Sequence, residues 1–239
     1  MSTLLLRLAA PLQSWGLSAK LEYRRSTERT PTKSGVVGLL AAALGRRRDQ
    51  SVDDLQALRF GVRVEREGVL LRDYHTVQHG KKPYITNRYY LVDALFLAGL
   101  EGDEAFLRQL DEALRYPLFP LFLGRRSCPP QGLVALGIRN GKTLLQTLSQ
   151  EPWLLSDYAR KKEDTQVRLR IVSDSDGSES ESYLQRDVPV SFDQAHRQFG
   201  FRRVTEHAPL LIDNPDSLRI TEEKSTEHDP MSELPQEEG

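Results

Sequence analysis

The chain has 239 residues, of which 28% are charged and 38% are hydrophobic, enough for one large domain or two small ones. It contains no apolar run of about 18 residues, so the sequence predicts no membrane span. Its N-terminal residues also lack the basic lead and long apolar region of a signal peptide. The single cysteine, Cys128, excludes an internal disulfide and a cysteine-based zinc site, and it fits a reducing cytoplasm.

Charge is distributed unevenly along the chain. Nine acidic and two basic residues give segment 213–239 a net charge of −7, which leaves +6 on residues 1–212 of a chain whose total is −1. Residues 20–48 hold eight basic residues against two acidic ones. A local basic patch matters more to a polyanion than the total charge does, although a solvated surface explains such a patch equally well. The acidic composition of segment 213–239 predicts a disordered tail.

In chain order, the first predicted element is a strand over Thr3–Leu8, apolar on both faces and therefore central in a sheet. The stretch RTPTKSGVVGLLAAALG, residues 29–45, predicts a helix from about Ser34 to Leu44, with Ser34 as a possible cap. Residues 58–77 alternate as a hairpin that turns at Glu67-Gly68. A strand over about 89–100 and an amphipathic helix over 102–114 follow.

The order strand, helix, hairpin, strand, helix predicts an α+β fold with a ferredoxin-like βαββαβ core over residues 1–145. Residues 116–130 should be ordered but not helical, because prolines trap their apolar positions, and GLVALGI (132–138) should close the sheet. Residues 146–212 predict a smaller β-rich region packed on the first, with strands at 166–172 and 200–207. The polar run between these two strands, residues 173–182, predicts a mobile loop.

The start of the predicted helix has the composition of an anion site. Backbone N–H groups at a helix N-terminus attract phosphate, and Lys33 adds a full charge. A P-loop is disfavoured because it needs glycines where Thr27 and Thr32 stand. Two interpretations remain open: Ser34 caps a purely structural helix, or the turn holds the phosphates of a nucleic-acid backbone.

Motifs of enzyme chemistry are scarce. The sequence holds no paired-carboxylate pattern, no histidine spacing of a metal site and no G-x-S-x-G, so no metal and no cofactor is expected. One constellation, RDYHTVQHGKK (72–82), places five candidate side chains close together in sequence: Tyr74, His75, His79, Lys81 and Lys82. A metal-free ribonuclease could use such groups for acid–base chemistry and for stabilising the phosphorane. A structural role for the histidines is the competing interpretation.

Binding chemistry is better represented. Single-stranded RNA is held by cations on its phosphates and by aromatic surfaces under its unstacked bases. Residues 79–90 interleave basic and tyrosine side chains, and LGRRSC (123–128) places two arginines beside an apolar loop. The string LQSW puts Gln13 and Trp15 at the end of the first strand. For Trp15 a core position is favoured over base stacking, because a tryptophan beside an apolar strand is usually buried.

Four strings in this order and spacing resemble a known family: LLRLAAPLQSWG (5–16), PTKSGVVGLLAAALG (31–45), LRDYHTV (71–77) and LGRRSCPP (123–130). They are similar to the Cas-five (CasD) subunits of the subtype I-E CRISPR Cascade complex, in the RAMP superfamily. The match runs from about Leu4 to Pro129, with a weaker echo in RDVP (186–189) and HRQFGFRRV (196–204). The acidic tail lies outside the resemblance.

The resemblance implies a ferredoxin-like core with an inserted β-hairpin thumb, mapped here to about 77–90 and shorter than is usual. It implies a non-catalytic subunit that caps the 5′ end of the crRNA, holds its repeat-derived handle and seats the large, PAM-reading subunit in antiviral DNA targeting. The implied partners are the crRNA, the large subunit CasA, the backbone subunit CasC, CasB and the nuclease CasE indirectly, and target DNA through the complex. A Cas-five relative of another subtype cuts the precursor RNA, so a metal-independent endoribonuclease using Tyr74, His75 and Lys81 remains the alternative.

The basic and aromatic stretches, together with the resemblance, define a set of candidate RNA-binding residues. They are Gln13, Trp15, Arg29, Thr32, Lys33, Ser34, Arg72, Tyr74, His75, Lys81, Lys82, Arg88, Arg125, Arg126 and Ser127.

Overall fold

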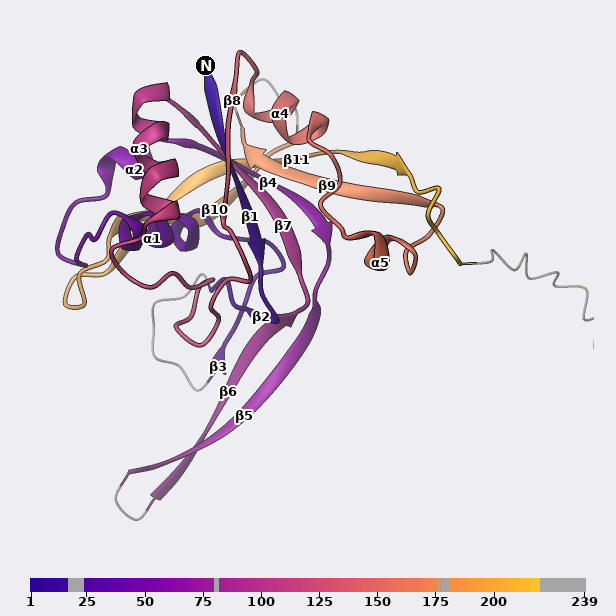
Figure 1. Cartoon of the computed structure of the whole chain (residues 1–239). Coiled ribbons are helices and arrows are strands. Elements are labelled where there is room, and N and C mark those ends of the chain that lie inside the picture. The colour runs from indigo at the N-terminus through magenta and orange to yellow at the C-terminus, as the bar shows by residue number, and fades with distance from the viewer. Residues whose placement is uncertain (17–23, 80–81, 176, 178–180, 220–239) are drawn as a thin grey trace, which may run out of the picture.

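The computed structural model describes residues 1–16, 24–79, 82–175, 177 and 181–219. Two antiparallel-rich sheets and a few helices give the chain an α+β architecture (Figure 1). Within the described ranges, no helix has the length and apolar character needed to cross a membrane.

The larger sheet has seven strands in the order β10-β11-β9-β4-β7-β1-β8. Every adjacent pair in it is antiparallel. The strands are β1 (Ser2–Ala9), β4 (Arg59–Arg66), β7 (Leu95–Gly102), β8 (Ala135–Asn140), β9 (Gln166–Asp174), β10 (Tyr183–Ser191) and β11 (Gln198–Asp213). The predicted first strand is therefore confirmed as an interior strand, and residues 135–140 close one edge of the sheet, as expected.

Helices cover both faces of this sheet, as the alternating leucines of β1 require. Leu4, Leu6 and Leu8 belong to the main core cluster with the apolar residues of α1 (Lys33–Ala43) and α3 (Glu104–Arg115). Leu5, which points to the opposite face, packs in a second cluster with residues of α4 (Leu144–Gln150). Two short helices, α2 (Asp53–Gln56) and α5 (Asp157–Arg160), complete the set. The predictions of α1 and α3 are confirmed, and residues 116–134 are ordered without helix or strand.

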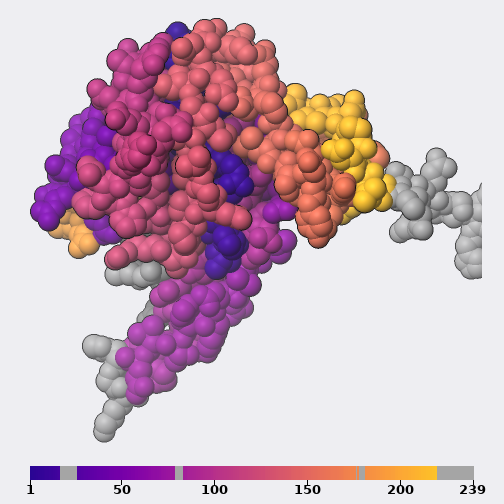
Figure 2. All heavy atoms as spheres, in the orientation of Figure 1, coloured from indigo at the N-terminus to yellow at the C-terminus, as the bar shows by residue number. Residues whose placement is uncertain are grey.

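The smaller sheet is built on a long hairpin. Strand β6 (Lys82–Val92) pairs along its whole length with β5 (Val69–His79), and at its base with β2 (Leu12–Gln13) and β3 (Arg24–Arg25). The pairing with β3 is parallel, while the other two pairings are antiparallel. The hairpin stands clear of the body of the molecule (Figures 1 and 2), so much of its surface faces outward.

The predicted hairpin over residues 58–77 is wrong in its pairing. Strand β4 pairs with β7 and β9, whereas β5 turns away and pairs with β6. Alternation identifies a strand but not its partner, and Gly68 marks a close approach instead of a tight turn. A Cβ at Gly68 would lie 2.7 Å from the Cβ of Ala94.

The predicted continuous strand over 89–100 is also wrong. The chain leaves β6 at Val92 and begins β7 at Leu95, in the other sheet. Asp93 makes the change of direction with a φ of 55°, a left-handed conformation that aspartate tolerates better than most residues. The hairpin strands consequently span 69–79 and 82–92, well beyond the predicted thumb of 77–90, and the tip residues 80 and 81 lie outside the described part.

The C-terminal strands extend the main sheet edge to edge, because β9 hydrogen-bonds to β4, and do not form a separate layer. The predicted loop over 173–182 begins later than expected, since Asp174 still belongs to β9. The predicted disorder of the tail is wrong for residues 213–219. Asn214 is buried, its Nδ2 donates to the carbonyls of Arg160 and Asp164, and the N–H of Leu218 donates to the carbonyl of Lys161. Residues 220–239 lie outside the described ranges.

Candidate nucleic-acid interface

Three loops meet at the base of the hairpin. The Ser14 N–H donates to the carbonyl of Leu123 at 3.2 Å, and the Ser14 hydroxyl donates to the carbonyl of Tyr89 at 3.1 Å. The Glu28 N–H donates to the carbonyl of Trp15 at 2.7 Å. These bonds tie the residues after β2, the loop before α1 and the loop after residue 122 to β6. Residues 13–15 lie at the end of β2 and not, as expected, at the end of the first strand. The sequence-predicted stretches 13–15, 29–34 and 125–127 are therefore brought together.

The loop over residues 123–128 presents its arginines from a fixed backbone. Gly124 has a φ of 83°, and a Cβ there would lie 1.6 Å from the carbonyl oxygen of Ser14, so only glycine fits. The Leu123 N–H donates to the carbonyl of Cys128, and the Cys128 N–H donates to the carbonyl of Arg125. Cys128 is buried, and burial raises the pKa of its thiol, so this cysteine packs as a neutral side chain.

Cations on this surface face outward or lie half-buried. Arg29 and Arg126 are exposed, as is the neighbouring Ser127. Arg125 is half-buried, with its guanidinium 4.6 Å from the centroid of the Tyr90 ring. The Nε of half-buried Arg88 is inaccessible and has no hydrogen-bond partner among the described residues. A buried guanidinium N–H normally has an acceptor, so this surface can accept an anion.

Two candidates for direct contact are buried instead. Trp15 is fully buried, and its indole N–H donates to Oε1 of Gln13 at 3.1 Å. Gln13 is also fully buried, and its Nε2 donates to the carbonyls of Leu8 and Ala94. A Cβ at Gly35 would lie 2.7 Å from the Trp15 ring, so the ring packs directly on α1. Both residues support the loops from within and present no polar atom to a ligand.

The start of α1 is capped by Thr32, two residues before the predicted cap Ser34. Thr32 is fully buried, and its hydroxyl oxygen accepts from the N–H of Gly35 at 3.3 Å. Ser34 is buried as well, and its hydroxyl donates to that of Thr32. The expectation that Lys33 offers a free positive charge is wrong. Its side chain is 8% exposed and its Nζ lies 3.1 Å from Oδ2 of Asp174.

The anion that this helix start binds comes from the chain itself. The Lys33 N–H donates to Oδ2 of Asp187 at 2.8 Å, as the helix N-terminus favours. Arg202 joins the two acids: its Nε and Nη2 donate to Asp187, and its Nη1 donates to Asp174. Burial, and then the like charge of Asp187, raise the pKa of the nearby Glu28 carboxyl. The helix start is thereby neutralised internally, and no phosphate is needed there.

Sequence reasoning missed this network because its members lie far apart in the chain. The sequence pattern places Asp174 in a polar loop, and nothing local marks the side chains of Asp187 or Arg202 as inaccessible. The weaker resemblance in RDVP and HRQFGFRRV was the signal that could have found them, since each string holds one member of the ion pair.

The remaining candidates lie on the hairpin. Arg72 is exposed, and its Nε donates to Oδ1 of Asn87. His75 is half-buried, with Nε2 2.5 Å from Oδ2 of Asp73, and Tyr74 is 56% exposed. Successive strand residues point to opposite faces, so Tyr74 and His75 do not share one. Lys81 and the side chain of Lys82 lie outside the described part.

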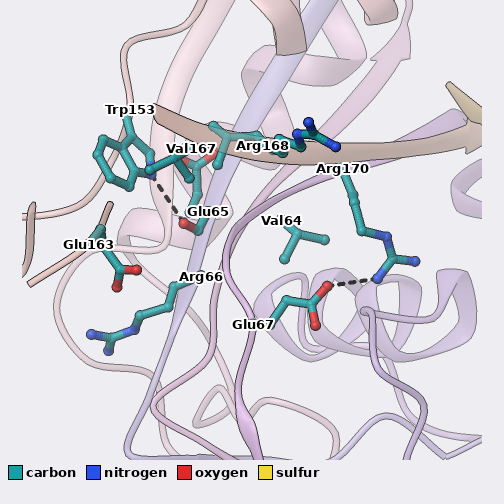
Figure 3. Close-up of a pocket in the computed structure, with 10 residues that line it drawn as sticks. Val64, Glu65, Arg66, Glu67, Trp153, Glu163, Val167, Arg168 and Arg170 are labelled. Atoms are coloured by element: carbon teal, nitrogen blue, oxygen red, sulfur yellow. Dashed lines mark hydrogen bonds and ion pairs between the residues drawn. The ribbon is translucent and has the colours of Figure 1, made fainter. Parts of the chain in front are cut away.

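A separate open pocket of about 370 Å³ lies where β4 ends, on the β9 side of the molecule (Figure 3). Burial raises the pKa of Glu65 there, more than its partner Arg63 lowers it. Both carboxylate oxygens of Glu65 are nevertheless occupied, one by Arg63 Nε and the other by the Leu154 N–H. Arg170 reaches across to Glu67. Glu65 and Glu67 are therefore both engaged by arginines and are not free to act as a general base.

Among the described residues, no group of three or more histidine, cysteine, aspartate or glutamate side chains is placed to hold a metal ion.

The chain belongs to the family described as CRISPR-associated protein (Cas_Cas5), whose model matches residues 3–205. It is 40% identical over 153 residues to the CRISPR system Cascade subunit CasD of Escherichia coli (strain K12), covering 54% of this chain and 67% of that protein.

Two solved structures are similar over nearly the whole chain. One, titled "Crystal structure of Cas protein", is 41% identical with a TM-score of 0.69, and covers 90% of this chain and 97% of that one. The other, titled "CRISPR RNA-guided surveillance complex", is 29% identical with a TM-score of 0.73, and covers 92% and 95%.

Proposed function

We propose that this chain is a non-catalytic, crRNA-binding subunit of a cytoplasmic subtype I-E Cascade complex, which holds the 5′ handle of the crRNA at the base of the β5–β6 hairpin. The observation that carries the proposal is the convergence of outward-facing cations on that base. Arg29, Arg126 and half-buried Arg88 come from three separate segments, and hydrogen bonds of Ser14 and of the Trp15 backbone hold these segments together. A single strand of RNA supplies the phosphates that such a surface binds.

The order of the elements supports a ferredoxin-like core within residues 1–145. In chain order β1, α1, β4, β7, α3 and β8 form a βαββαβ unit, and their four strands lie in the order β4-β7-β1-β8. We infer that this unit is the RAMP core of the family. The hairpin between β4 and β7 is then the inserted thumb, and β9–β11 are an addition to the core sheet.

The exposed apolar residues of the hairpin fit a protein partner. Val77, Tyr84 and Ile85 are 47%, 39% and 50% exposed near its tip, and Val69 is 72% exposed near its base. Apolar side chains gathered on a projecting element mark an interaction surface. In the proposed complex, the outer part of this hairpin meets the adjoining backbone subunit (CasC), while the body seats the large, PAM-reading subunit (CasA). CasB and CasE are indirect neighbours, and target DNA is reached through the complex.

The endoribonuclease alternative loses support from the geometry of β5. A reacting phosphate cannot contact Tyr74 and His75 together, because their side chains leave opposite faces of the strand. His75 is engaged by Asp73, which is consistent with a structural role. Incubating the purified chain with labelled repeat RNA in EDTA tests the point. No cleavage is expected, whereas a specific cut that His75→Ala abolishes would establish the alternative.

RNA binding is tested by a fluorescence titration of labelled repeat RNA across a salt series. The double variant Arg29→Ala/Arg126→Ala should lower the slope of log K against log salt by about 1.4, which is about 0.7 for each lost phosphate contact. The matched control is Arg168→Ala, because Arg168 is also exposed but lies on β9 beside the pocket. Equal slopes for the two variants would overturn the proposal.

A further inference from the structure

Ten described arginines have an ion-pair partner: Arg46, Arg59, Arg63, Arg108, Arg115, Arg139, Arg160, Arg170, Arg202 and Arg219. Arg29, Arg88 and Arg126 lie around the hairpin base and form no ion pair with a described residue. A second group, Arg48, Arg186, Arg197 and Arg203, is not part of that surface, and none of its members pairs with a carboxylate in the part of the chain that the structure describes.

Two members of this second group, Arg186 and Arg203, lie on β10 and β11. The Arg186 guanidinium lies 5.8 Å from the Phe201 ring centroid, and its Nε donates to the carbonyl of Phe199 at 3.3 Å. Arg197 lies 5.8 Å from the Phe199 ring centroid. Burial, and then the like charge of Arg48, lower the pKa of Arg197. The Phe199 ring contacts that of Phe192, which packs on α1 at Gly38, so Arg197 and Arg48 lie on the α1 side of these strands.

The two sides of these strands differ sharply. Asp187 and Arg202 point inward to α1 and β4, where they close the buried network. Residues on the other side face solvent: Phe201 is 64% exposed, and Arg186 and Arg203 are exposed. Leu184, opposite Arg203 in the register, is also 64% exposed. An exposed phenylalanine flanked by unpaired arginines is the combination with which sheets bind single strands, the ring under a base and the cations on phosphates.

We propose that the outer face of β10–β11, formed by Leu184, Arg186, Phe201 and Arg203, binds single-stranded DNA. A duplex is the poorer occupant, because Phe201 can stack only on an unstacked base. The choice of DNA over RNA rests on the proposed function: with the crRNA handle held at the hairpin base, the strand left without a pairing partner when RNA pairs with a target is DNA.

Binding of fluorescein-labelled oligo(dT) of about 15 nucleotides to the purified full-length chain tests this assignment. Phe201→Ala should weaken binding roughly tenfold with an unchanged salt slope, because it removes a stacking surface and no charge. Arg186→Ala/Arg203→Ala should lower the slope by about 1.4. Arg168→Ala, on the neighbouring strand β9, should leave both quantities unchanged. All four side chains are exposed, so melting temperatures should not move.

A crosslink locates the strand directly. Oligo(dT) carrying 5-iododeoxyuridine should crosslink to Phe201, and the Phe201→Ala variant should lose that crosslink. Absence of oligo(dT) binding by the wild-type chain, or oligo(dT) affinities that the Phe201 and Arg186/Arg203 variants leave unchanged, would overturn the proposal. Capture of an acidic peptide on this face in place of oligo(dT) would likewise overturn it.

The two surfaces are separated by exchanging probes. Arg29→Ala/Arg126→Ala should lower the affinity for repeat RNA and leave the affinity for oligo(dT) unchanged. Arg186→Ala/Arg203→Ala should lower the affinity for oligo(dT) and leave the affinity for repeat RNA unchanged. If the first variant changes the affinity for neither probe, the proposed function is wrong, while the proposal of a DNA-binding face is retained. If the second weakens repeat RNA as strongly as oligo(dT), the outer face is part of the RNA site and the assignment to DNA is wrong.

Discussion

At the start of α1 the positive charge is neutralised inside the fold, whereas at residues 125–127 it faces outward. Lys33 pairs with Asp174, and the helix N-terminus binds the Asp187 carboxylate. The other loop has the same Arg/Lys-Ser composition and a comparably fixed backbone, yet Arg126 is exposed. The difference lies in what packs against each segment. Strands β9 and β10 bring two acids to the helix start, and no described acid forms an ion pair with Arg126.

This contrast shows that a helix N-terminus with a basic residue can bind a carboxylate of the same chain instead of an external anion. Arg202, 9% exposed at its side chain, holds both acids in place. The network therefore joins the C-terminal strands to the start of α1, beside the surface proposed to bind RNA. Substitutions in the two regions should separate stability from binding.

The largest effect is expected at Trp15, which supports both regions. Its ring packs against Gly35 of α1, and the neighbouring Ser14 holds the 123–128 loop. Trp15→Ala should lower the free energy of unfolding by about 4 kcal/mol, because a large buried side chain is replaced by a cavity. Urea denaturation measures this loss. A stable variant that has lost only RNA affinity would show that the indole stacks on a base.

Asp187→Ala should disrupt only the hydrogen-bond network at the start of α1. It removes the acceptor of the Lys33 N–H and two of the bonds of a buried guanidinium. Breaking a buried ion pair from one side costs about 3 kcal/mol or more, so the free energy of unfolding should fall by about that amount.

Arg126→Ala is the matched comparison for Asp187→Ala. Replacement of an exposed, unpaired side chain should change the free energy of unfolding by about 0.5 kcal/mol or less. Equal losses for the two variants in the same urea series would contradict the contrast between a buried network and an exposed loop.

A smaller effect separates two truncations of the tail. Ending the chain after Asp213 removes buried Asn214, whose amide donates two hydrogen bonds to backbone carbonyls. The loss should be about 2 kcal/mol in the free energy of unfolding. Ending it after Arg219 removes only the acidic segment and should leave stability unchanged, with RNA affinity equal or tighter. Equal melting temperatures for the two truncations would show that Asn214 is dispensable.

Local chemistry in the sequence predicted the elements well and the pairings poorly. The apolar run of β1, the apolar stripe of α3 and the helix from about Ser34 follow from periodicity, and all three are present, although the cap is Thr32 and not Ser34. The partner of β5 depends on Asp93 and Gly68, whose roles appear only when two sheets are placed together. Periodicity carries no information about which strand lies beside another.

The sequence predicted which segments form the candidate site better than it predicted the role of each residue. The strings around residues 13–15, 29–34 and 125–127 do converge, but Gln13, Thr32 and Lys33 prove to be buried. Their burial depends on Asp174 and on the packing of Trp15 against α1, both set by distant parts of the chain. A basic side chain is available to a ligand only if no acidic residue pairs with it in the folded chain. The acids at the start of α1, Asp174 and Asp187, are far from Lys33 in sequence.

The salt dependence of repeat-RNA binding by Arg126→Ala and Lys33→Met tests the central claim most directly. Each variant removes one positive charge, but only Arg126 faces outward. Arg126→Ala should lower the slope of log K against log salt by about 0.7 without changing stability. Lys33→Met should lower stability and leave the slope at its wild-type value. A slope lowered by Lys33→Met and unchanged by Arg126→Ala would place the phosphates at the start of α1 and contradict the account.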